Sequence, residues 1–294
     1  MKTIEINEND ANQRLDKFIS KLMPTLPKSA LYKGLRKNNV RLNGKHFHKG
    51  EYMLRCGDVV TIYFPDEFLK EKKSAPELPM PKIVYEDENI LVCDKPVNLP
   101  SHADDKGSSD TLVGRVLYYL EKKGEYDPEK EKTFTPALCN RLDRNTRGLV
   151  IAAKNAQALR IINEKIRNRE IKKYYIAVCE GIFSKKEDTL TAQLSRGEKK
   201  SYISSVGCEI KTHYRVLSEK NNTSVVEIEL LTGRTHQIRA HMAHIGHALC
   251  GDVKYGAAKA KGGYKLISYR LVFDFKSSAD SLNYLKGKEI RLQM

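Results

Sequence analysis

Residues 140–153 have the sequence NRLDRNTRGLVIAA, in which a charged loop leads directly into an apolar strand. A continuous apolar run such as the terminal LVIAA is typical of strands that are covered on both faces. The loop before this strand holds a single carboxylate, Asp143, among three arginines: Arg141, Arg144 and Arg147. Cations near a carboxylate stabilise its charged form. We therefore expect Asp143 either to act as nucleophile or base on a substrate whose phosphates the arginines hold, or to order the loop through ion pairs.

A second unusual stretch covers residues 231–247, LTGRTHQIRAHMAHIGH. Its apolar residues recur at helical spacing, so we predict a helix over residues 237–245, with Thr235 as its N-cap and Gly246 as its end. Arg239 would lie in the first turns of this helix, on the side away from the apolar stripe. The stretch holds four histidines, but it has no H-E-x-x-H pattern and no acidic residue. We therefore expect packed or hydrogen-bonded histidines rather than a metal site.

The segments around these two stretches predict a mixture of strands and helices. Residues 90–93 form another apolar run, and residues 226–230 alternate between apolar and acidic side chains, as in a half-exposed strand. Asn155 is predicted to cap a helix, and this helix carries an apolar stripe and an outer basic face. The stripe contains Leu159, Ile162 and Ile166, and the outer face contains Arg160, Lys165, Arg167 and Arg169. Together these elements indicate an α+β domain over residues 81–294.

The first 64 residues predict a smaller domain of two helices and short strands. The helices would begin after Asn12 and at Ser29, each residue serving as N-cap. Asn43-Gly44 predicts a β-hairpin, and residues 59–64 predict a further strand. Residues 21–50 contain eight cations and no acidic residue, a pattern that favours phosphate contacts over an ordinary solvated face. The eight are Lys21, Lys28, Lys33, Arg36, Lys37, Arg41, Lys45 and Lys49.

The length of the chain, 294 residues, suggests two domains. Residues 65–80, PDEFLKEKKSAPELPM, are predicted to link them, because they combine three prolines and mixed charges with no hydrophobic period. With 40% hydrophobic residues, the composition excludes a disordered chain. No apolar run approaches the ~20 residues needed to cross a bilayer, and the amino terminus lacks a signal-peptide pattern. We therefore expect a soluble, cytoplasmic protein.

The charge of the chain is strongly positive, with 52 Lys+Arg against 37 Asp+Glu and a formal net charge of +15. Such a surplus indicates either a polyanionic partner, nucleic acid first, or a merely basic surface. The six cysteines are spread along the chain without a C-x-x-C pair. Disulfides and a zinc site are therefore not expected, which agrees with a reducing compartment.

Four segments resemble motifs of the RluA-type pseudouridine synthases, in the same order along the chain. They are residues 84–96 (VYEDENILVCDKP), residues 140–154, residues 173–178 (KYYIAV) and residues 231–256. Residues 12–64 resemble the S4 RNA-binding domain, which often precedes the catalytic domain in this family. The resemblance implies a pseudouridine synthase catalytic fold, an α+β fold with a mixed and largely antiparallel central sheet, preceded by a small α/β S4-like domain. The domains would be residues 1–64 and 81–294.

The resemblance also assigns roles to individual residues. Asp143 would be the catalytic aspartate and Arg239 its ion-pair partner, and a bidentate guanidinium suits a lone carboxylate among cations. Tyr175 would lie against the uracil ring, while strand alternation turns Tyr174 to the opposite face. Arg141 would help to keep the flipped nucleotide out of its helix. Further expected RNA or substrate contacts are Arg144, Arg147, Arg234, His236, Gln237, Lys28, Lys33, Arg36, Lys37 and Arg41.

The implied reaction isomerises uridine in RNA to pseudouridine, and it requires no cofactor, ATP or metal. The expected substrate is 23S (large-subunit) ribosomal RNA, and the expected state is a monomer. Two alternatives stay open: a transfer RNA substrate for the same reaction, and a non-catalytic RNA-binding or ribosome-assembly protein. The sequence departs from the usual family pattern at Asn140, Asn145 and Arg147, where His, Asp and a small residue are common. These departures put the choice of uridine in doubt, whereas Asp143 is kept.

Overall fold

The computed structural model describes residues 1–69, 71, 74–103, 107–198 and 200–293. The chain divides into two compact units. The first contains Met1–Glu77, Leu117–Ala137 and Lys154–Gln157, and the second contains Leu78–Val116, Leu138–Ala153 and Ala158–Met294. The division at residues 77 and 78 falls within the predicted linker, in which residues 70, 72 and 73 lie outside the described residues. No helix among the described residues is long and apolar enough to span a membrane.

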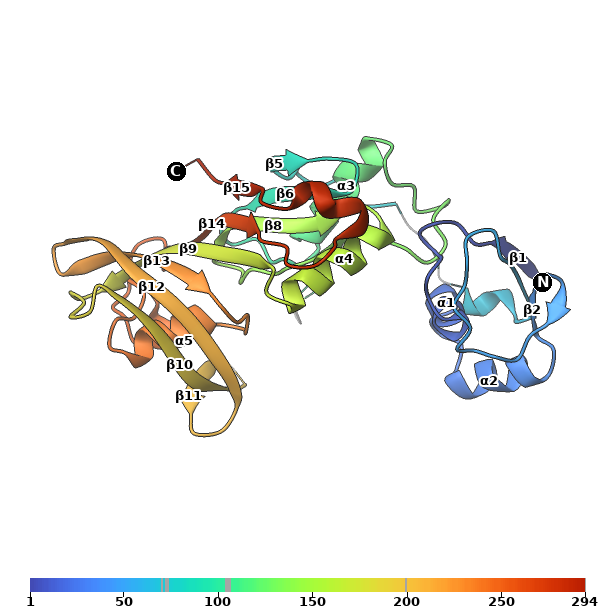
Figure 1. Cartoon of the computed structure of the whole chain (residues 1–294), viewed down its shortest axis with the longest axis horizontal. Coiled ribbons are helices and arrows are strands. Elements are labelled where there is room, and N and C mark those ends of the chain that lie inside the picture. Colours follow the sequence, from blue (N-terminus) through green and yellow to red (C-terminus); the bar gives the residue numbers. More distant parts are fainter. Residues whose placement is uncertain (70, 72–73, 104–106, 199, 294) are drawn as a thin grey trace. The chain divides into compact units, whose positions relative to one another are not determined.

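In the first unit, the described residues of Met1–Glu77 form two α-helices (Figure 1) and a four-stranded sheet. The strand order is β1-β4-β2-β3. The helices are α1 (Leu15–Leu22) and α2 (Lys28–Arg36), and the strands are β1 (Lys2–Glu5), β2 (Val40–Leu42), β3 (Lys45–His46) and β4 (Val59–Ile62); a short 3₁₀ turn, Asp66–Phe68, follows. Asn43 and Gly44 both have positive φ, 52° and 78°, as a two-residue type I′ turn requires, so the predicted hairpin is confirmed.

Both predicted N-caps in this unit are wrong. Helix α1 is preceded by Arg14, while Asn12 adopts a left-handed conformation with φ 58° and donates its backbone N–H to Leu54. Helix α2 begins directly after Pro27, so Ser29 lies inside its first turn. Pro27 takes the N-cap position, and its carbonyl accepts the hydrogen bond from the Leu31 N–H, so the helix starts at Lys28, one residue before the serine.

The second unit is built on a large mixed sheet, which confirms the predicted α+β class. Among the described residues it has 11 strands, nine of them in the order β11-β10-β12-β13-β9-β14-β8-β6-β5, with β15 beside β14 and β7 beside β8. Along the nine-strand order every pair is antiparallel except β14 with β8, which are parallel, and β15 is antiparallel to β14. The strands are β5 (Ile83–Glu86), β6 (Ile90–Lys95), β7 (Ala137–Leu138), β8 (Arg147–Ala153), β9 (Ile171–Glu180), β10 (Glu187–Arg196), β11 (Ser201–Ser204), β12 (Cys208–Lys220), β13 (Thr223–Leu230), β14 (Leu266–Phe273) and β15 (Glu289–Arg291).

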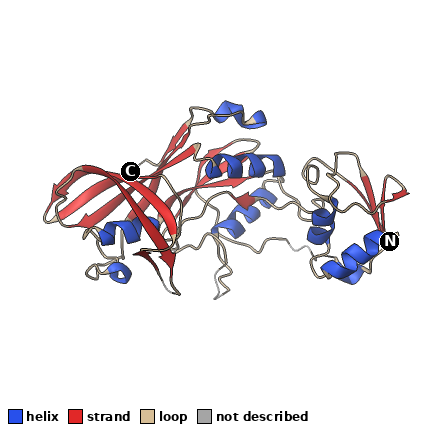
Figure 2. Ribbon diagram, turned by 60° about the horizontal axis from the view of Figure 1, so that its bottom comes forward, coloured by secondary structure: helices blue, strands red, loops and turns tan. Residues whose placement is uncertain are grey.

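Three α-helices and two 3₁₀ turns accompany this sheet in the described part of the chain: α3 (Leu112–Lys122), α4 (Ala156–Arg167), α5 (Gln237–His244), η2 (Val253–Tyr255) and η3 (Asp280–Leu285). Figure 2 shows the helices beside the long twisted strands. The apolar runs predicted as strands covered on both faces are β6 and β8, whose side chains are almost completely buried. Residues 226–230 lie in β13, where Val226 and Ile228 are buried and the acidic residues between and after them are half-buried, as alternation predicts.

One prediction on helix α4 is wrong, because Lys165 lies inside the protein rather than on the basic outer face. Its side chain is only 1% exposed, and its Nζ donates to Glu170 Oε2 (2.9 Å) and to the carbonyl and hydroxyl oxygens of Ser277 (2.9 and 2.6 Å). The buried stripe of the helix runs through residues 158, 161, 162 and 165, one position away from the predicted stripe. A lysine can occupy this stripe because Glu170 neutralises its charge.

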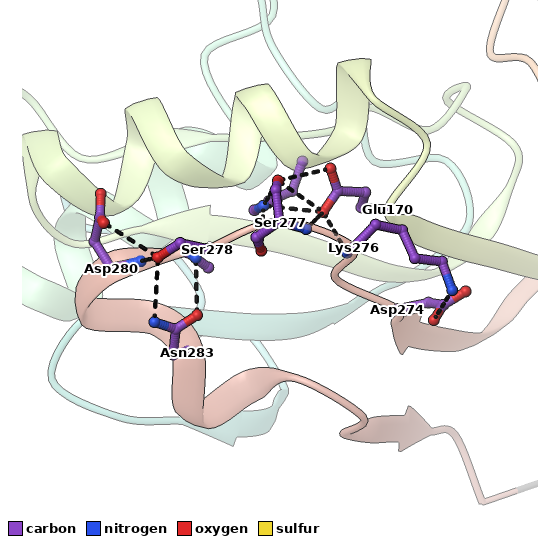
Figure 3. Close-up of polar contacts among 9 residues, drawn as sticks. Glu170, Asp274, Lys276, Ser277, Ser278, Asp280 and Asn283 are labelled. Carbon is purple, nitrogen blue, oxygen red and sulfur yellow. Dashed lines mark hydrogen bonds and ion pairs between the residues drawn. The ribbon is translucent and has the colours of Figure 1, made fainter.

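Glu170 in turn holds the segment after β14 (Figure 3). Its carboxylate accepts hydrogen bonds from the backbone N–H groups of Lys276 (2.8 Å) and Ser277 (3.3 Å). Burial works to raise the pKa of Glu170, but Lys165 and the backbone donors outweigh it and lower the pKa to about 2. The ionised carboxylate therefore connects α4, β9 and the chain that leads to η3.

We expect the stability contributed by this cluster to be lost in acid. A carboxyl group whose pKa falls from 4.5 to about 2 on folding stabilises the protein above pH 4.5, and it loses this contribution as the pH falls toward 2. Glu170→Gln should cost about 3–5 kcal/mol at neutral pH, because it leaves the Lys165 charge buried without a partner. Urea unfolding of both proteins between pH 7 and 2 measures the difference. A difference that stayed constant down to pH 2 would contradict an ionised Glu170.

Candidate active site

The loop that carries Asp143 is held in place by its junction with β8. Gly148 has φ 132° and pairs with Ser268 of the parallel neighbour β14. A Cβ atom at this position would stand only 2.2 Å from the carbonyl oxygen of Ser268, so a side chain there would push the two strands apart. Glycine therefore permits the close approach of β8 and β14. As a result, the loop of residues 139–146 emerges beside β14 and β9.

Two residues outside the loop fasten its backbone on either side of Asp143. The Nζ of Lys95, at the end of β6, is fully buried and donates to the carbonyls of Pro96 (3.0 Å), Leu99 (2.7 Å) and Arg144 (3.0 Å). Burial lowers the pKa of Lys95 to about 8, although the charge of Asp143 opposes this shift. Ser101 exchanges two hydrogen bonds with the backbone of Leu142 (2.9 and 3.1 Å). Sequence reasoning quoted Lys95 in a family motif without assigning it this role, and it missed Ser101.

Arg239 presents its guanidinium to two carboxylates. Its Nε and Nη2 donate to Asp252 at 2.6 and 2.7 Å, and its Nη1 lies 3.7 Å from Asp143 Oδ2. The guanidinium carbon also lies 4.8 and 4.5 Å from the ring centroids of Tyr255 and Tyr264. The bidentate partner of Arg239 is therefore Asp252, which sequence reasoning did not assign. Asp143 lies at the free edge of the same guanidinium.

Helix α5 begins at Gln237, as predicted, but the predicted N-cap Thr235 is wrong. The residue directly before the helix is His236, which has a left-handed φ of 59°. This conformation places Nδ1 3.1 Å from the Tyr255 hydroxyl and Nε2 3.7 Å from Asp143 Oδ2. Burial lowers the pKa of His236, against the opposing effect of Asp143. The imidazole is therefore a neutral neighbour of the aspartate at pH 7.

Tyr175 lies in β9 with its side chain 5% exposed, and it faces the same cavity as Asp143. Burial raises the pKa of Tyr175 to about 12, and the charge of Asp143 adds to the effect. Tyr174 is on the opposite face, where the guanidinium of Arg270 lies 3.7 Å from its ring centroid. The prediction that only one of the two tyrosines faces the site is confirmed.

The cavity has a volume of about 1010 Å³ and brings together most of the residues that were predicted for the site. These are Asp143, Arg239, Tyr175, Arg141, Arg144, Arg234, His236 and Gln237. Gln237, however, is 1% exposed, and its amide is engaged by Lys211, Thr212, Thr232 and the Arg234 backbone. It holds the loop before α5.

The remaining predicted residues are elsewhere. Arg147 does not line this cavity, and its guanidinium makes a bidentate contact with Asp94 (3.1 and 2.8 Å). The other five predicted RNA contacts belong to the first unit: Lys28, Lys33 and Arg36 of α2, Lys37 directly after it, and Arg41 of β2. In the part of the chain that the structure describes, no group of three His, Cys, Asp or Glu side chains could hold a metal ion.

The mixed sheet carries a cavity that Asp143 lines, and comparison with known proteins identifies the chain as an isomerase of the pseudouridine synthase class. The family model described as RNA pseudouridylate synthase matches residues 89–244. The ribosomal large subunit pseudouridine synthase C of Vibrio cholerae is 32% identical over 267 residues, which cover 86% of this chain and 80% of the relative. An uncharacterized RNA pseudouridine synthase of Aquifex aeolicus is 31% identical over 270 residues, covering 90% and 84%. The chain therefore belongs to the RNA pseudouridylate synthase family.

A solved structure shows the same fold. The human RNA pseudouridylate synthase domain containing 4 superposes with a TM-score of 0.56 and 20% sequence identity, over 72% of this chain and 88% of the other. The family model and the curated relatives confirm the resemblance to the RluA-type enzymes at the level of family and enzyme class.

Proposed function

We propose that this enzyme isomerises specific uridines of large-subunit ribosomal RNA to pseudouridine, with Asp143 as the catalytic carboxylate. The observation that carries the proposal is the position of Asp143 in a cavity that Arg239 and Tyr175 also line. The relative in Vibrio cholerae, and another in Buchnera aphidicola that is 32% identical over 264 residues, are named as large-subunit enzymes. These names favour ribosomal over transfer RNA.

In this reaction the bond between ribose C1′ and uracil N1 breaks, the base turns, and C1′ joins C5. The hydrogen on C5 leaves as a proton, and N1 gains a proton, so substrate and product are isomers. A base within a helix must first be flipped out, which costs a few kcal/mol of stacking. Three exposed arginines line the cavity: Arg141, Arg144 and Arg234. Their contacts to RNA phosphates would offset the cost of flipping the base.

Within the cavity, each of the central residues has a distinct task. Asp143 acts on the flipped nucleotide, and Arg239 orients its carboxylate with a positive charge 3.7 Å away. Tyr175 offers a buried ring on which uracil can stack. A cavity of about 1010 Å³ is large enough for a nucleotide, since pockets for ligands of this size measure roughly 300–1,000 Å³.

We further propose that the first domain is S4-like and docks the RNA through α2 and the residue after it. Lys28, Lys33, Arg36 and Lys37 are exposed there, on the outside of a helix that buries Leu31 and Leu35. Exposed cations along one helix suit the phosphates of an RNA backbone.

Replacing two of these cations should weaken RNA binding in a salt-dependent way. We expect Lys33→Gln/Arg36→Gln to reduce the slope of log K against log salt by about 1.4–1.8, because two phosphate contacts are lost. Titration of ribosomal RNA fragments at several salt concentrations measures this slope. The control is Lys185→Gln, which removes a lysine that pairs with Asp188. An unchanged slope in the double variant would exclude α2 as a docking surface.

A transcriptome-wide pseudouridine map with and without the gene tests the substrate. We expect sites in large-subunit ribosomal RNA to disappear on deletion and to return with the wild-type gene but not with Asp143→Asn. Loss of sites in transfer RNA alone would assign the other substrate. No lost site at all would favour a non-catalytic RNA-binding protein.

A further inference from the structure

Lys173 is a cation in the cavity wall to which no role has been assigned. It lies two residues before Tyr175 in β9, so both side chains project from the same face of the strand and both line the cavity. Its side chain is half-buried, and burial lowers its pKa. Within the described ranges, no carboxylate lies within ion-pair distance of its Nζ. The neighbouring Lys172, on the opposite face, pairs with Asp274 at 3.1 Å.

The surroundings of Lys173 do not compensate its charge. Leu138, Ile166 and Leu230 line the same cavity with apolar side chains. A Cβ atom built on Gly233 would stand 3.7 Å from the Lys173 Nζ, so the ammonium group lies beside the backbone of the loop before α5. Removing an ammonium group from water without a partner is unfavourable. A substrate group that accepts hydrogen bonds would remove this penalty.

The position of Lys173 favours the uracil base, rather than the phosphates, as the substrate group that accepts its hydrogen bond. The exposed Arg141 and Arg234 suit phosphates, which remain hydrated at a cavity rim. Lys173 instead shares a wall with Tyr175, the ring on which the proposed function places uracil. The edge of a stacked uracil carries the carbonyl oxygens O2 and O4, which are acceptors for an ammonium donor.

We propose that Lys173 Nζ donates a hydrogen bond to a carbonyl oxygen of the target uracil and stabilises the negative charge of the detached base. This inference rests on the proposed function. When the C1′–N1 bond breaks, the electron pair stays with the base, and the charge spreads over N1, O2 and O4. A fixed cation in a partly desolvated cavity stabilises such a developing charge strongly.

One ammonium group can serve before and after the base turns. A half-turn of uracil about the axis through N3 and C6 exchanges N1 with C5 and O2 with O4. A carbonyl oxygen therefore occupies the same place in both orientations, and Lys173 keeps its contact while C5 takes the position of N1. C5 then bonds to C1′, the C5 proton leaves, and N1 takes up a proton.

The test is Lys173→Met, measured as single-turnover tritium release from RNA labelled at uracil C5, together with RNA affinity and thermal stability. We expect the rate at saturating RNA to fall about 10²–10³-fold, as when one donor to a developing anion is removed. RNA affinity and its salt slope should stay unchanged. The midpoint of thermal unfolding should be equal or higher, because a desolvated charge without a protein partner has been removed.

Lys172→Met is the matched control on the opposite face of β9 and should retain the wild-type rate. Lys173→Arg keeps a cation and should restore part of the activity. An unchanged rate in Lys173→Met overturns the inference. Weaker RNA binding by this variant, with a salt slope reduced by about 1, also overturns it, because that result would assign Lys173 to a phosphate contact. A rate loss that accompanies lower thermal stability, or that Lys172→Met shares, would indicate a structural role. Absence of tritium release from the wild-type enzyme would instead contradict the proposed function itself.

Discussion

Asp143→Asn is expected to abolish isomerisation while leaving the protein folded. The amide has the shape of the carboxylate but carries no charge, and it can act neither as nucleophile nor as base. Loss of a catalytic group of this kind lowers turnover by about 10⁴-fold or more. The fold should tolerate the change, because Arg239 and His236 both approach Asp143 at 3.7 Å, beyond hydrogen-bond distance. Single-turnover tritium release from RNA labelled at uracil C5 measures the loss.

The matched control is Asp110→Asn, since Asp110 forms a bidentate pair with Arg115 and does not line the cavity. This variant should release tritium at the wild-type rate. RNA should still bind to Asp143→Asn with an affinity within about threefold of wild type, because removing one anion from a basic cavity does not disturb phosphate contacts. Undiminished release by Asp143→Asn would exclude Asp143 as the catalytic residue.

Features set by local sequence patterns were predictable from the chain. The apolar run at residues 149–153 is a buried strand, Asn43-Gly44 closes a hairpin, and Tyr174 and Tyr175 face opposite sides of β9. Each of these follows from a period or a turn preference that acts over a few residues. The resemblance to known motifs added the pairing of Asp143 with Arg239, and the structure brings these two residues within 3.7 Å across 96 residues of sequence.

Contacts between distant segments could not be predicted in the same way. Three arginines next to Asp143 suggested a shared substrate site, yet Arg147 pairs with Asp94, which is 53 residues away. Lys165 fits an outer basic face by composition, but Glu170 and Ser277 compensate its charge inside the protein. A sequence shows that a residue is charged, but not which partner the fold will place beside it. For this reason the motif segments included Asp252 and Lys95, but the sequence did not reveal that Asp252 pairs with Arg239 or that Lys95 holds the Asp143 loop.

Arg239→Ala is expected to cause the second large loss, in both stability and activity. Asp252 is 2% exposed and receives two short hydrogen bonds from Arg239. Removing the guanidinium leaves this carboxylate buried and unpaired, which costs about 3–5 kcal/mol. Activity should fall as well, because Asp143 loses the cation at its side. Urea unfolding and tritium release at a temperature where the variant is still folded measure the two effects.

A double variant separates the two roles of Arg239. Arg239→Met/Asp252→Leu replaces the buried pair with apolar side chains between the rings of Tyr255 and Tyr264. Such replacements are often neutral or stabilising, so stability should return to within about 1 kcal/mol of wild type. Activity should remain lost, because the apolar pair offers no charge to Asp143. If the double variant regained the wild-type rate, Arg239 would act only as a structural partner of Asp252. Asp143 would then perform its chemistry without a neighbouring guanidinium.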